Sequence, residues 1–519
     1  MVVSTRMITN EPGRRDVTRG QGALAGVAAG AAALGVAELL AAILPGAMSP
    51  IIAVGDLVIA LQPAGAKQLM VDLFGEADKL LLNLVIAAVA LTAAAIIGMV
   101  ARNRPAAAQV GFGAFGLLAV GAGLREPLAE PIITLIISVA AVVVAIGTFQ
   151  LLIGLARGPR VPSAEMPDWE RRRFLGTSLA VVGVAAGAGL LGRFLVQNAV
   201  GAAQAVEIPP PLAPAASPPP PLDVAGITSL VTPNTEFYRI DTALLVPRAD
   251  METWRLRMTG LVDRPLELTY DELLAMPLFE QYVTIACVSN EVGGHLVGNA
   301  LWRGVHLKEL FERAGVQPEA SQVVGRSIDG FTVGFPLAHA LADDREAMVA
   351  VAMNGEALPA SHGFPARLIV PGLFGYVSAT KWLSEIELTT WEGFDAYWVP
   401  LGWSKEGPIL TQSRIDTPRS GDRPAAGIVP IAGVAWAPDR GVRAVEIQVD
   451  DGPWVEAEVS SPISDATWVQ FVHRWDATPG DHRLQVRAID GTGDVQTDQR
   501  TPPAPDGARG HHTVSVTVG

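Results

Sequence analysis

Five long apolar stretches in the first 200 residues constrain this chain more than any other feature. A helix that crosses about 30 Å of hydrocarbon needs about 20 consecutive apolar residues. The stretches that meet this requirement are Gly22–Leu44, Leu80–Ala101, Ala106–Leu124, Ile132–Leu155 and Phe174–Val196. Their content of Ala, Gly, Val and Leu suits close packing of helices in a membrane. The sequence therefore predicts an N-terminal all-α transmembrane bundle over residues 1–200.

Two further features of this region leave alternatives open. Ile51–Leu61 is too short to span a bilayer and contains Asp56, so an interfacial segment or a loop is expected up to Phe74. Glu38 lies well inside the first predicted span without an obvious basic partner, and ionisable groups at such depth are candidates for function. Glu38 either serves a proton or ion pathway or faces another helix while protonated. The expected role of the whole region is that of an anchor or docking platform.

The basic residues of the loops predict the orientation of the helices, because loops rich in Lys and Arg remain in the cytoplasm. One set of loops carries most of these residues, namely Arg6, Arg14, Arg15, Arg19, Arg102, Arg104, Arg157, Arg160, Arg171, Arg172 and Arg173. The alternate loops offer only Lys67 and Arg125, with Lys79 at a boundary. The N-terminus is therefore expected in the cytoplasm, and five crossings place the chain after Val196 outside it.

The arginines that precede the fifth span have a second interpretation. Glu170-Arg171-Arg172-Arg173-Phe174-Leu175 resembles a twin-arginine export signal, in which two arginines are followed by any residue, Phe and Leu. Such signals lie at N-termini, whereas this one is internal. It would suit a protein whose last domain folds around a cofactor before it crosses the membrane. The alternative is a basic anchor at the start of a helix.

The rest of the chain divides into a linker and two predicted domains. Residues 201–221 are rich in Pro and Ala and are expected to form a stiff, extended spacer. Residues 222–418 mix helical turns with buried strands, which predicts an α+β domain. Its expected elements are helical turns at Asp271–Met276 and Leu307–Ala314 and strands at Val349–Met353 and Arg367–Val370.

The last hundred residues, 419–519, read as strand after strand. Turn signals such as Asp451-Gly452 and Pro479-Gly480 separate the predicted strands. These strands are Val442–Val449, Trp468–Arg474 and His482–Ala488. Their spacing predicts a small antiparallel, Ig-like β-sandwich.

Composition excludes several classes of function. A formal net charge of −14 argues against a nucleic-acid binder, which would need a basic face. A single cysteine excludes a disulfide framework, an iron–sulfur cluster, a cysteine-based zinc site and covalent c-type haem. All eight histidines lie after position 290, so the predicted membrane helices offer no His ligand and no haem is expected.

The single cysteine is the first candidate for chemistry. Cys287 ends an apolar strand and is followed by polar Ser289 and Asn290 and then by Gly293-Gly294. An isolated cysteine is more often a small buried hydrophobe than a functional group. An exposed free thiol outside the cytoplasm would also oxidise easily. The spacing of these residues leaves both interpretations open.

Motifs around Cys287 make the case for function. Thr232-Pro233-Asn234-Thr235-Glu236-Phe237-Tyr238-Arg239 comes first, and the cysteine and Trp302-Arg303-Gly304-Val305 follow. After Asn354-Gly355 come His362-Gly363-Phe364-Pro365-Ala366-Arg367, Val370-Pro371-Gly372 and Ala379-Thr380-Lys381-Trp382. In this order the motifs resemble the sulfite oxidase family of molybdopterin enzymes, and the resemblance runs from Leu222 to the C-terminus. It implies a sulfite-oxidase-type domain over 222–418 and a dimerisation-type sandwich over 419–519, for which a homodimer is one expectation.

The resemblance also implies roles for individual residues. Cys287 would ligate molybdenum as a thiolate, a soft donor for this metal. Arg239 and Tyr397 match the residues that face the substrate in this family, Tyr397 with an offset of one residue. The implied contacts to the Mo-molybdopterin cofactor are Asn234, Tyr238, Arg239, Ser327, His362, Arg367, Ala379, Thr380 and Lys381.

Structural alternatives stand beside these roles. Asp329-Gly330, next to Ser327, is an ordinary turn, and Asp329 is the other residue that could match the family contact assigned to Ser327. Lys381 could be a solvated charge, and His362 a hydrogen-bonded structural histidine. Arg367 and Lys381 are the cations suited to the terminal phosphate of the pterin.

The sequence departs from sulfite oxidases at their anion pocket. Two arginines that follow Asn290 in that family are replaced by Glu291 and Val292, and their Arg-Asn-His segment reads Arg239-Ile240-Asp241. A pocket that loses an arginine and gains acidic neighbours should bind sulfite less well. The sequence therefore favours reduction of an S- or N-oxide over oxidation of sulfite.

Two hypotheses from different classes follow. The favoured one is a membrane-anchored, extracytoplasmic molybdenum oxidoreductase that acts on a small molecule and exchanges electrons with a separate protein. The alternative is a cofactor-free structural or binding module of a membrane complex that has kept the fold.

Overall fold

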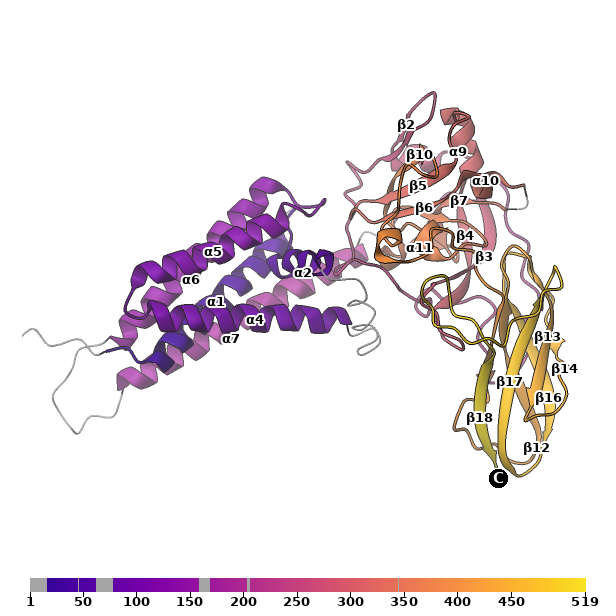
Figure 1. Ribbon diagram of the computed structural model, residues 1–519. Coiled ribbons are helices and arrows are strands. Elements are labelled where there is room, and N and C mark those ends of the chain that lie inside the picture. Colours follow the sequence, from indigo (N-terminus) through magenta and orange to yellow (C-terminus); the bar gives the residue numbers. More distant parts are fainter. Residues whose placement is uncertain (1–15, 45, 62–77, 158–168, 203–205, 344) are drawn as a thin grey trace, which may run out of the picture. The chain divides into compact units, whose positions relative to one another are not determined.

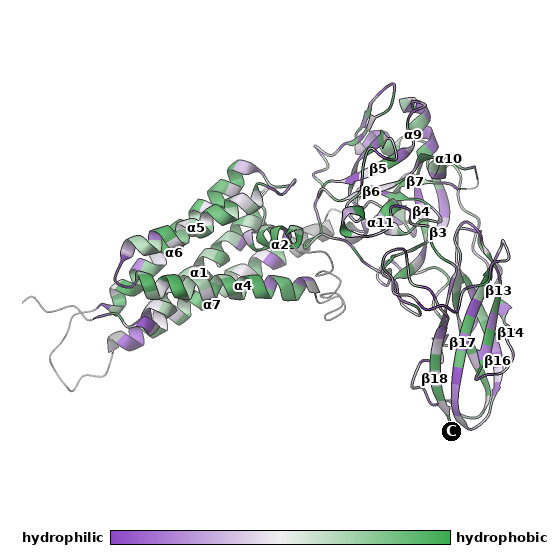
Figure 2. Ribbon diagram, viewed as in Figure 1, coloured by the Kyte–Doolittle hydropathy of each residue, from purple (hydrophilic) through white to green (hydrophobic). Residues whose placement is uncertain are grey.

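The computed structural model describes residues 16–44, 46–61, 78–157, 169–202, 206–343 and 345–519. The chain divides into two compact units, Met1–Gly201 and Ala202–Gly519. Figure 1 labels their helices and strands, and Figure 2 shows that hydrophobic residues dominate the helices of the first unit.

The first unit is built from helices. In the described ranges these are α1 (Arg19–Ile43), α2 (Pro50–Ala60), α4 (Asp78–Ala101), α5 (Pro105–Gly123), α6 (Pro131–Ala156) and α7 (Trp169–Ala202). Among the described residues, five of them, all except α2, are long and apolar enough to cross a membrane. These five coincide with the five stretches expected from the sequence, although α7 starts earlier and ends later than expected.

Glycines allow the helices of this unit to approach one another closely. A Cβ atom on Gly26 of α1 would lie 2.1 Å from the carbonyl oxygen of Ala94 on α4, and one on Gly98 would lie 2.1 Å from that of Gly22. On the α7 side, a Cβ on Gly192 would lie 2.7 Å from the Glu38 carbonyl oxygen. The backbones therefore meet where only glycine fits, as small residues permit in packed membrane helices.

The first part of the stretch expected as an interfacial segment or loop forms the short helix α2, so a loop is wrong there, while residues 62–74 lie outside the described residues. Ser49 caps this helix, and its side-chain oxygen accepts a hydrogen bond from the Ile52 amide at 3.3 Å. The Ser49 hydroxyl also donates to a carboxylate oxygen of Glu38 at 2.5 Å, and Arg193 on α7 attracts the same carboxylate. Glu38 thus has polar partners on two other elements, which are not visible from its own helix.

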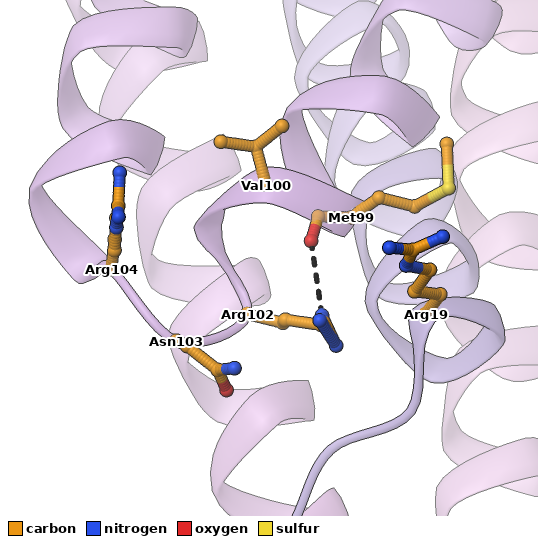
Figure 3. A pocket seen from close by; sticks show the side chains of 6 residues that line it. All are labelled: Arg19, Met99, Val100, Arg102, Asn103 and Arg104. Carbon is orange, nitrogen blue, oxygen red and sulfur yellow. Dashed lines mark hydrogen bonds between the residues drawn. The ribbon is translucent and has the colours of Figure 1, made fainter.

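Arginines gather at one end of the first unit. Arg19, Arg102 and Arg104 line a pocket of about 460 Å³ together with Met99, Val100 and Asn103. Figure 3 shows the bond from the Arg102 guanidinium to the Met99 carbonyl oxygen, 3.2 Å long. Three of the arginines from the predicted cytoplasmic loops therefore lie close together. Arg6, Arg14, Arg15, Arg160 and, on the opposite side, Lys67 lie outside the described residues.

The second unit begins with one mixed and one antiparallel sheet, which share one hydrophobic core. One has the order β2-β1-β10-β5-β6 and the other the order β3-β4-β7-β8, with β9 paired to β7. The strands are β1 (Leu256–Gly260), β2 (Leu266–Leu268), β3 (Phe279–Ala286), β4 (Val297–His306), β5 (Gln322–Ser327), β6 (Thr332–Pro336), β7 (Met348–Met353), β8 (Glu356–Ala357), β9 (Arg367–Ile369) and β10 (Leu383–Thr389). The helices among them are α8 (Tyr270–Leu274), α9 (Leu307–Ala314), α10 (Leu337–Leu341), α11 (Gly375–Ser378), η2 (Ala360–His362) and η3 (Val399–Leu401).

Two four-stranded sheets complete the unit as a β-sandwich. Their orders are β11-β12-β16-β15 and β14-β13-β17-β18, and residues of both sheets form a common core. The strands are β11 (Gln412–Thr417), β12 (Gly427–Trp436), β13 (Val442–Val449), β14 (Val455–Glu456), β15 (Glu458–Val459), β16 (Val469–Ala477), β17 (Gly480–Asp490) and β18 (His512–Val518). Because β11 pairs with β12, the sandwich starts before the expected boundary at residue 419.

The proline-rich segment expected as a spacer lies on the second unit in its described part. The Leu212 amide donates to the Leu278 carbonyl at 2.7 Å, and the Glu280 amide donates to the Ala213 carbonyl at 2.9 Å. The Arg303 guanidinium donates to the Pro209 carbonyl at 2.9 Å. Proline supplies no N–H, but its extended backbone leaves carbonyls free to accept such bonds.

Candidate functional site

Cys287 directly follows strand β3 and begins a tight loop that returns to β4. Its amide donates to the Leu296 carbonyl at 2.9 Å, and its carbonyl accepts from the Asn290 amide at 3.1 Å. The Asn290 side chain closes the loop by accepting from the Leu296 amide at 2.8 Å. A Cβ on Gly294 would lie 2.5 Å from the same Asn290 oxygen, so glycine is needed there. These bonds hold a side chain that is 8 % exposed at the end of a rigid strand.

Two residues of the β-sandwich contact this loop. Arg414 of β11 donates to the Gly294 carbonyl at 2.8 Å. The ring of His512 in β18 occupies the space beside Gly293, where a Cβ would lie 2.2 Å from a ring carbon. Burial and the charge of Arg414 lower the pKa of His512 to about 4, so this imidazole is neutral near pH 7. The cysteine loop is thus fixed by residues more than 100 positions away in the sequence.

Tyr238 interacts electrostatically with both Cys287 and Arg367. Burial raises the pKa of Tyr238, a charge on Cys287 raises it further, and Arg367 opposes both effects. Arg367 is 3 % exposed, and its guanidinium carbon lies 4.9 Å from the ring centroid of Trp302. Burial lowers the pKa of Arg367 to about 10, which still leaves a buried cation at neutral pH.

His362 connects this group to the Asn234 segment. One ring nitrogen, Nε2, lies 3.1 Å from the Asn234 carbonyl oxygen, and the His362 carbonyl accepts from Arg367 at 2.9 Å. Burial, followed by the charges of Arg367 and Lys381, lowers the pKa of His362 to about 4. The imidazole is therefore neutral at physiological pH and offers one ring nitrogen to a further partner.

Arg239 and Lys381 meet at one carboxylate. The Arg239 Nε and the Lys381 Nζ donate to the same Oδ2 atom of Asp241, at 2.9 and 3.1 Å. The Lys381 ammonium also donates to the Ser361 carbonyl at 3.1 Å. Burial lowers the pKa of Lys381 to about 8, although Asp241 opposes the shift. The lysine is therefore a buried, paired cation and not the solvated surface charge of the alternative interpretation.

Three other predicted residues lie on the segments that surround this pair. Ala379 directly follows α11, and its amide donates to the Gly375 carbonyl at 3.0 Å. Thr380 is fully buried, and its carbonyl accepts from the Leu368 amide at 3.0 Å. Ser327 ends β5, and its buried hydroxyl contacts Asp329.

Asp329 belongs to the turn suggested by Asp329-Gly330. Burial raises the pKa of the Asp329 carboxyl, and the nearby charge of Asp241 raises it further. The ring of Tyr397 lies 5.5 Å from that of Phe331, which follows this turn two residues after Asp329. The ring of Trp398 lies 5.1 Å from Tyr397 on another side. The structure thus places Tyr397 between two aromatic rings, those of Phe331 and Trp398.

Several polar atoms of this site lack a hydrogen-bond partner among the described residues. They are His362 Nδ1, Arg367 Nε and Thr380 Oγ1, all buried. An unsatisfied buried polar group costs about 1–3 kcal/mol, so such groups are normally paired. Three of them on residues predicted to bind one cofactor fit a polar group bound between them.

Sequence reasoning missed two residues that position this site. Asn354 donates to the Asn234 side-chain oxygen at 2.8 Å and to the Thr232 carbonyl at 2.9 Å, and its φ of 52° fits the Asn-Gly turn noted in the sequence. In the sequence, Asp241 stands out only as a departure from the Arg-Asn-His pattern of sulfite oxidases. Its bonds to Arg239 and Lys381 join positions 140 residues apart, which no local pattern reveals.

Known proteins and a family model match this part of the chain. Residues 243–398 match the family model described as an oxidoreductase molybdopterin binding domain. This range includes Cys287, Lys381 and Tyr397, whereas Asn234 and Arg239 precede it.

Relatives cover different parts of the chain. The uncharacterized oxidoreductase YuiH of Bacillus subtilis is 35 % identical over 181 residues, which are 34 % of this chain and 87 % of that protein. Human mitochondrial sulfite oxidase is 28 % identical over 320 residues, which are 52 % of this chain and 58 % of that protein. The chain thus spans about three fifths of the length of the curated sulfite oxidases that it matches.

Among solved structures, the sulfane dehydrogenase SoxCD of Paracoccus pantotrophus aligns with a TM-score of 0.49 and 24 % identity, over 55 % of this chain and 81 % of that chain. The family assignment rests on the sequence matches, since YuiH is covered over most of its length at 35 % identity and the domain model spans the residues around Cys287. The chain belongs to the sulfite oxidase family of molybdopterin-binding oxidoreductases.

Proposed function

We propose that this chain is a membrane-anchored molybdenum oxidoreductase whose second unit works outside the cytoplasm. The observation that carries the proposal is the set of buried atoms on His362, Arg367 and Thr380 that lack a partner among the described residues. Of these residues, Arg367 acts electrostatically on Tyr238, as Cys287 does. A structural module without a cofactor would leave these groups unsatisfied at a cost in stability.

The residues present suit the Mo-molybdopterin cofactor. Cys287 supplies a thiolate to molybdenum, and the rigid loop after β3 holds it in place. Arg367 and Lys381 supply cations for the terminal phosphate. The remaining contacts to the pterin come from Asn234, Tyr238, Arg239, Ser327, His362, Ala379 and Thr380. When bound, the cofactor supplies two-electron oxygen-atom transfer, and the protein orients and tunes it.

A neutral or zwitterionic S- or N-oxide is the substrate class that we favour. Sulfite is a small dianion near neutral pH, and a pocket for it needs cations that offset the cost of removing its water. Val292 and Glu291 stand where the sulfite oxidase pattern has arginines. Loss of one charge-assisted contact costs on the order of 1.5–3 kcal/mol, or roughly one to two decades in affinity. Arg239 and Tyr397 are the residues that we place beside the substrate.

Electrons reach or leave this site through a separate protein in our proposal. The helices of the first unit contain no histidine, so they offer no imidazole for a haem. Their length and apolarity support a role as membrane anchor and docking platform for that partner. The sandwich supports a homodimer by its resemblance to the dimerisation domain of the family.

The first test is the molybdenum content of the full-length protein purified in detergent, measured by mass spectrometry. We expect about one molybdenum per chain. A protein that is folded and free of molybdenum and pterin after expression in a molybdenum-supplied host would favour the cofactor-free binding module instead.

The second test addresses the substrate. Steady-state kinetics of the full-length, molybdenum-loaded protein with a dye as electron partner should show turnover of an S- or N-oxide. Oxidation of sulfite with a micromolar KM, together with no reduction of either oxide, would return this protein to the sulfite-oxidising branch.

A further inference from the structure

We infer that Asp241 is a specificity-determining residue that pairs the substrate-facing Arg239 with the cofactor-binding Lys381 and so disfavours dianions. This inference rests on the proposed function, because it concerns the substrate of the same site. Its basis is the single oxygen of Asp241 that accepts from both Arg239 and Lys381, at 2.9 and 3.1 Å. Arg239 is the residue that the family pattern places beside the substrate.

The ion pair is sheltered from solvent on the carboxylate side. The side chains of Asp241 and Lys381 are 6 % and 10 % exposed, whereas that of Arg239 is 39 % exposed. Screening by water and salt is therefore weak at the carboxylate and stronger at the outer face of the guanidinium. A buried charge that lost its partner would be costly, so the carboxylate is expected to remain between the two cations.

A second carboxyl group lies close to the first. The charge of Asp241 contributes to the raised pKa of Asp329, which places the two acidic groups within electrostatic range. Asp241, which pairs with both cations, therefore has a second acidic side chain nearby, while Arg367 is a further cation that acts on Lys381. His362 adds no positive charge here, because burial and nearby cations lower its pKa to about 4.

The ion pair between Asp241 and Arg239 has opposite consequences for the two classes of substrate. A dianion would have to compete with Asp241 for the Arg239 guanidinium and would meet repulsion from the carboxylate. A neutral S- or N-oxide carries only a partial negative charge on its oxygen, so the exposed face of the guanidinium can donate to it while Asp241 stays in place. The ion pair therefore discriminates between substrates by their charge and not by their shape.

The test compares Asp241→Asn with the wild-type full-length protein at equal molybdenum content. Binding of sulfite is measured by isothermal titration calorimetry, and the KM for dimethyl sulfoxide is measured with a dye. Removal of this negative charge beside Arg239 should tighten sulfite binding about 10-fold to 100-fold and change the sulfoxide KM by a smaller factor. Sulfite affinity that stays at the wild-type value would overturn the inference.

Two further variants complete the design. Asp343→Asn removes a carboxylate that pairs with Lys308 at 2.7 Å on the fully exposed surface, and it should leave sulfite binding unchanged. Asp329→Asn removes the neighbouring acid without breaking the ion pair, and it should tighten sulfite binding several-fold even where Asp241→Asn fails to fold. Equal tightening in Asp343→Asn would show an effect of net charge alone and would also overturn the inference.

The outcome separates this inference from the proposed function. A wild-type protein that reduces no S- or N-oxide, in which Asp241→Asn still tightens sulfite binding, would refute the favoured substrate class and support the role of Asp241. A wild-type protein that reduces these oxides, with sulfite affinity equal in wild type and Asp241→Asn, would do the reverse.

Discussion

The side-chain oxygen of Thr284 accepts a hydrogen bond from the backbone amide of Trp468 at 2.8 Å. Thr284 belongs to β3, the strand that ends at Cys287, and Trp468 immediately precedes β16 of the sandwich. Both side chains are fully buried, and the Trp468 indole donates to the Leu230 carbonyl at 2.7 Å. The strand that presents the cysteine is therefore joined to the sandwich by buried polar contacts.

The first prediction concerns this junction. Thr284→Val keeps the shape of the side chain and leaves the buried Trp468 amide without its acceptor, which should lower the free energy of unfolding by about 1–3 kcal/mol. Urea titration followed by tryptophan fluorescence measures the change. Thr253→Val, on an exposed turn, is the control and should stay within about 0.5 kcal/mol of wild type. Equal stability of Thr284→Val and wild type would show that the junction contributes nothing.

The second prediction concerns the metal. Since Cys287 is the only thiol of the chain, Cys287→Ser should abolish turnover while the unit stays folded and the pterin stays largely bound. Activity, circular dichroism and pterin fluorescence after release provide the three measurements. Ser289→Ala, two residues along the same loop, is the matched control. Wild-type turnover in Cys287→Ser would remove the assignment of the molybdenum ligand.

The third prediction is a dependence on pH. The pKa of Lys381 is lowered to about 8, so the side chain is charged below this pH and loses its proton above it. A bound phosphate favours the charged form, and cofactor affinity should therefore fall as the pH rises above about 8, by up to about tenfold per unit. Cofactor retention after dialysis at a series of pH values measures this decline.

Two lysine variants sharpen that experiment. Lys381→Arg keeps the positive charge at alkaline pH and should flatten the profile, because a guanidinium does not titrate in this range. Lys308→Arg, on the surface, should keep the wild-type profile. Retention that is independent of pH in the wild type would argue against a role of Lys381 at the phosphate.

The fourth prediction concerns the arginines at the start of α7. If the Arg171–Arg172 pair is recognised as an export signal, replacing both residues with Lys should leave the second unit inside the cell although the charge is unchanged. Protease protection of spheroplasts measures the location. The same replacement of Arg102 and Arg104 is the control and should leave the location unaltered. Normal placement of the α7 variant would reduce its arginines to a basic anchor.

Local patterns in the sequence predicted the five long helices and a minority of the strands. The strand Val442–Val449 and the helix Leu307–Ala314 occur with the expected bounds, because alternation and amphipathicity are properties of adjacent residues. The short helix α2 was not resolved from a loop by its composition alone. At the site, the motifs identified His362 and Arg367, each of which has one buried nitrogen without a partner among the described residues.

Pairings between distant residues could not be predicted in this way. The bonds from Asp241 to Lys381 and from Trp468 to Thr284 depend on how the sheets pack, and no spacing in the sequence encodes them. The partners of Glu38 on α2 and α7 were equally invisible. In each case a polar group was recognised from its position, but its partner came from another element.

The support of the cysteine loop by β18 has a consequence for the timing of biosynthesis. His512 fills the space beside Gly293. The loop after Cys287 therefore lacks this contact until the ribosome has added more than 200 further residues. Domains usually fold as units during translation, and contacts between distant segments form late. The five apolar helices precede all of these residues and have left the ribosome long before. Under the proposed function, the cofactor is therefore expected to bind only after β18 has been synthesised, when the five apolar helices have already left the ribosome.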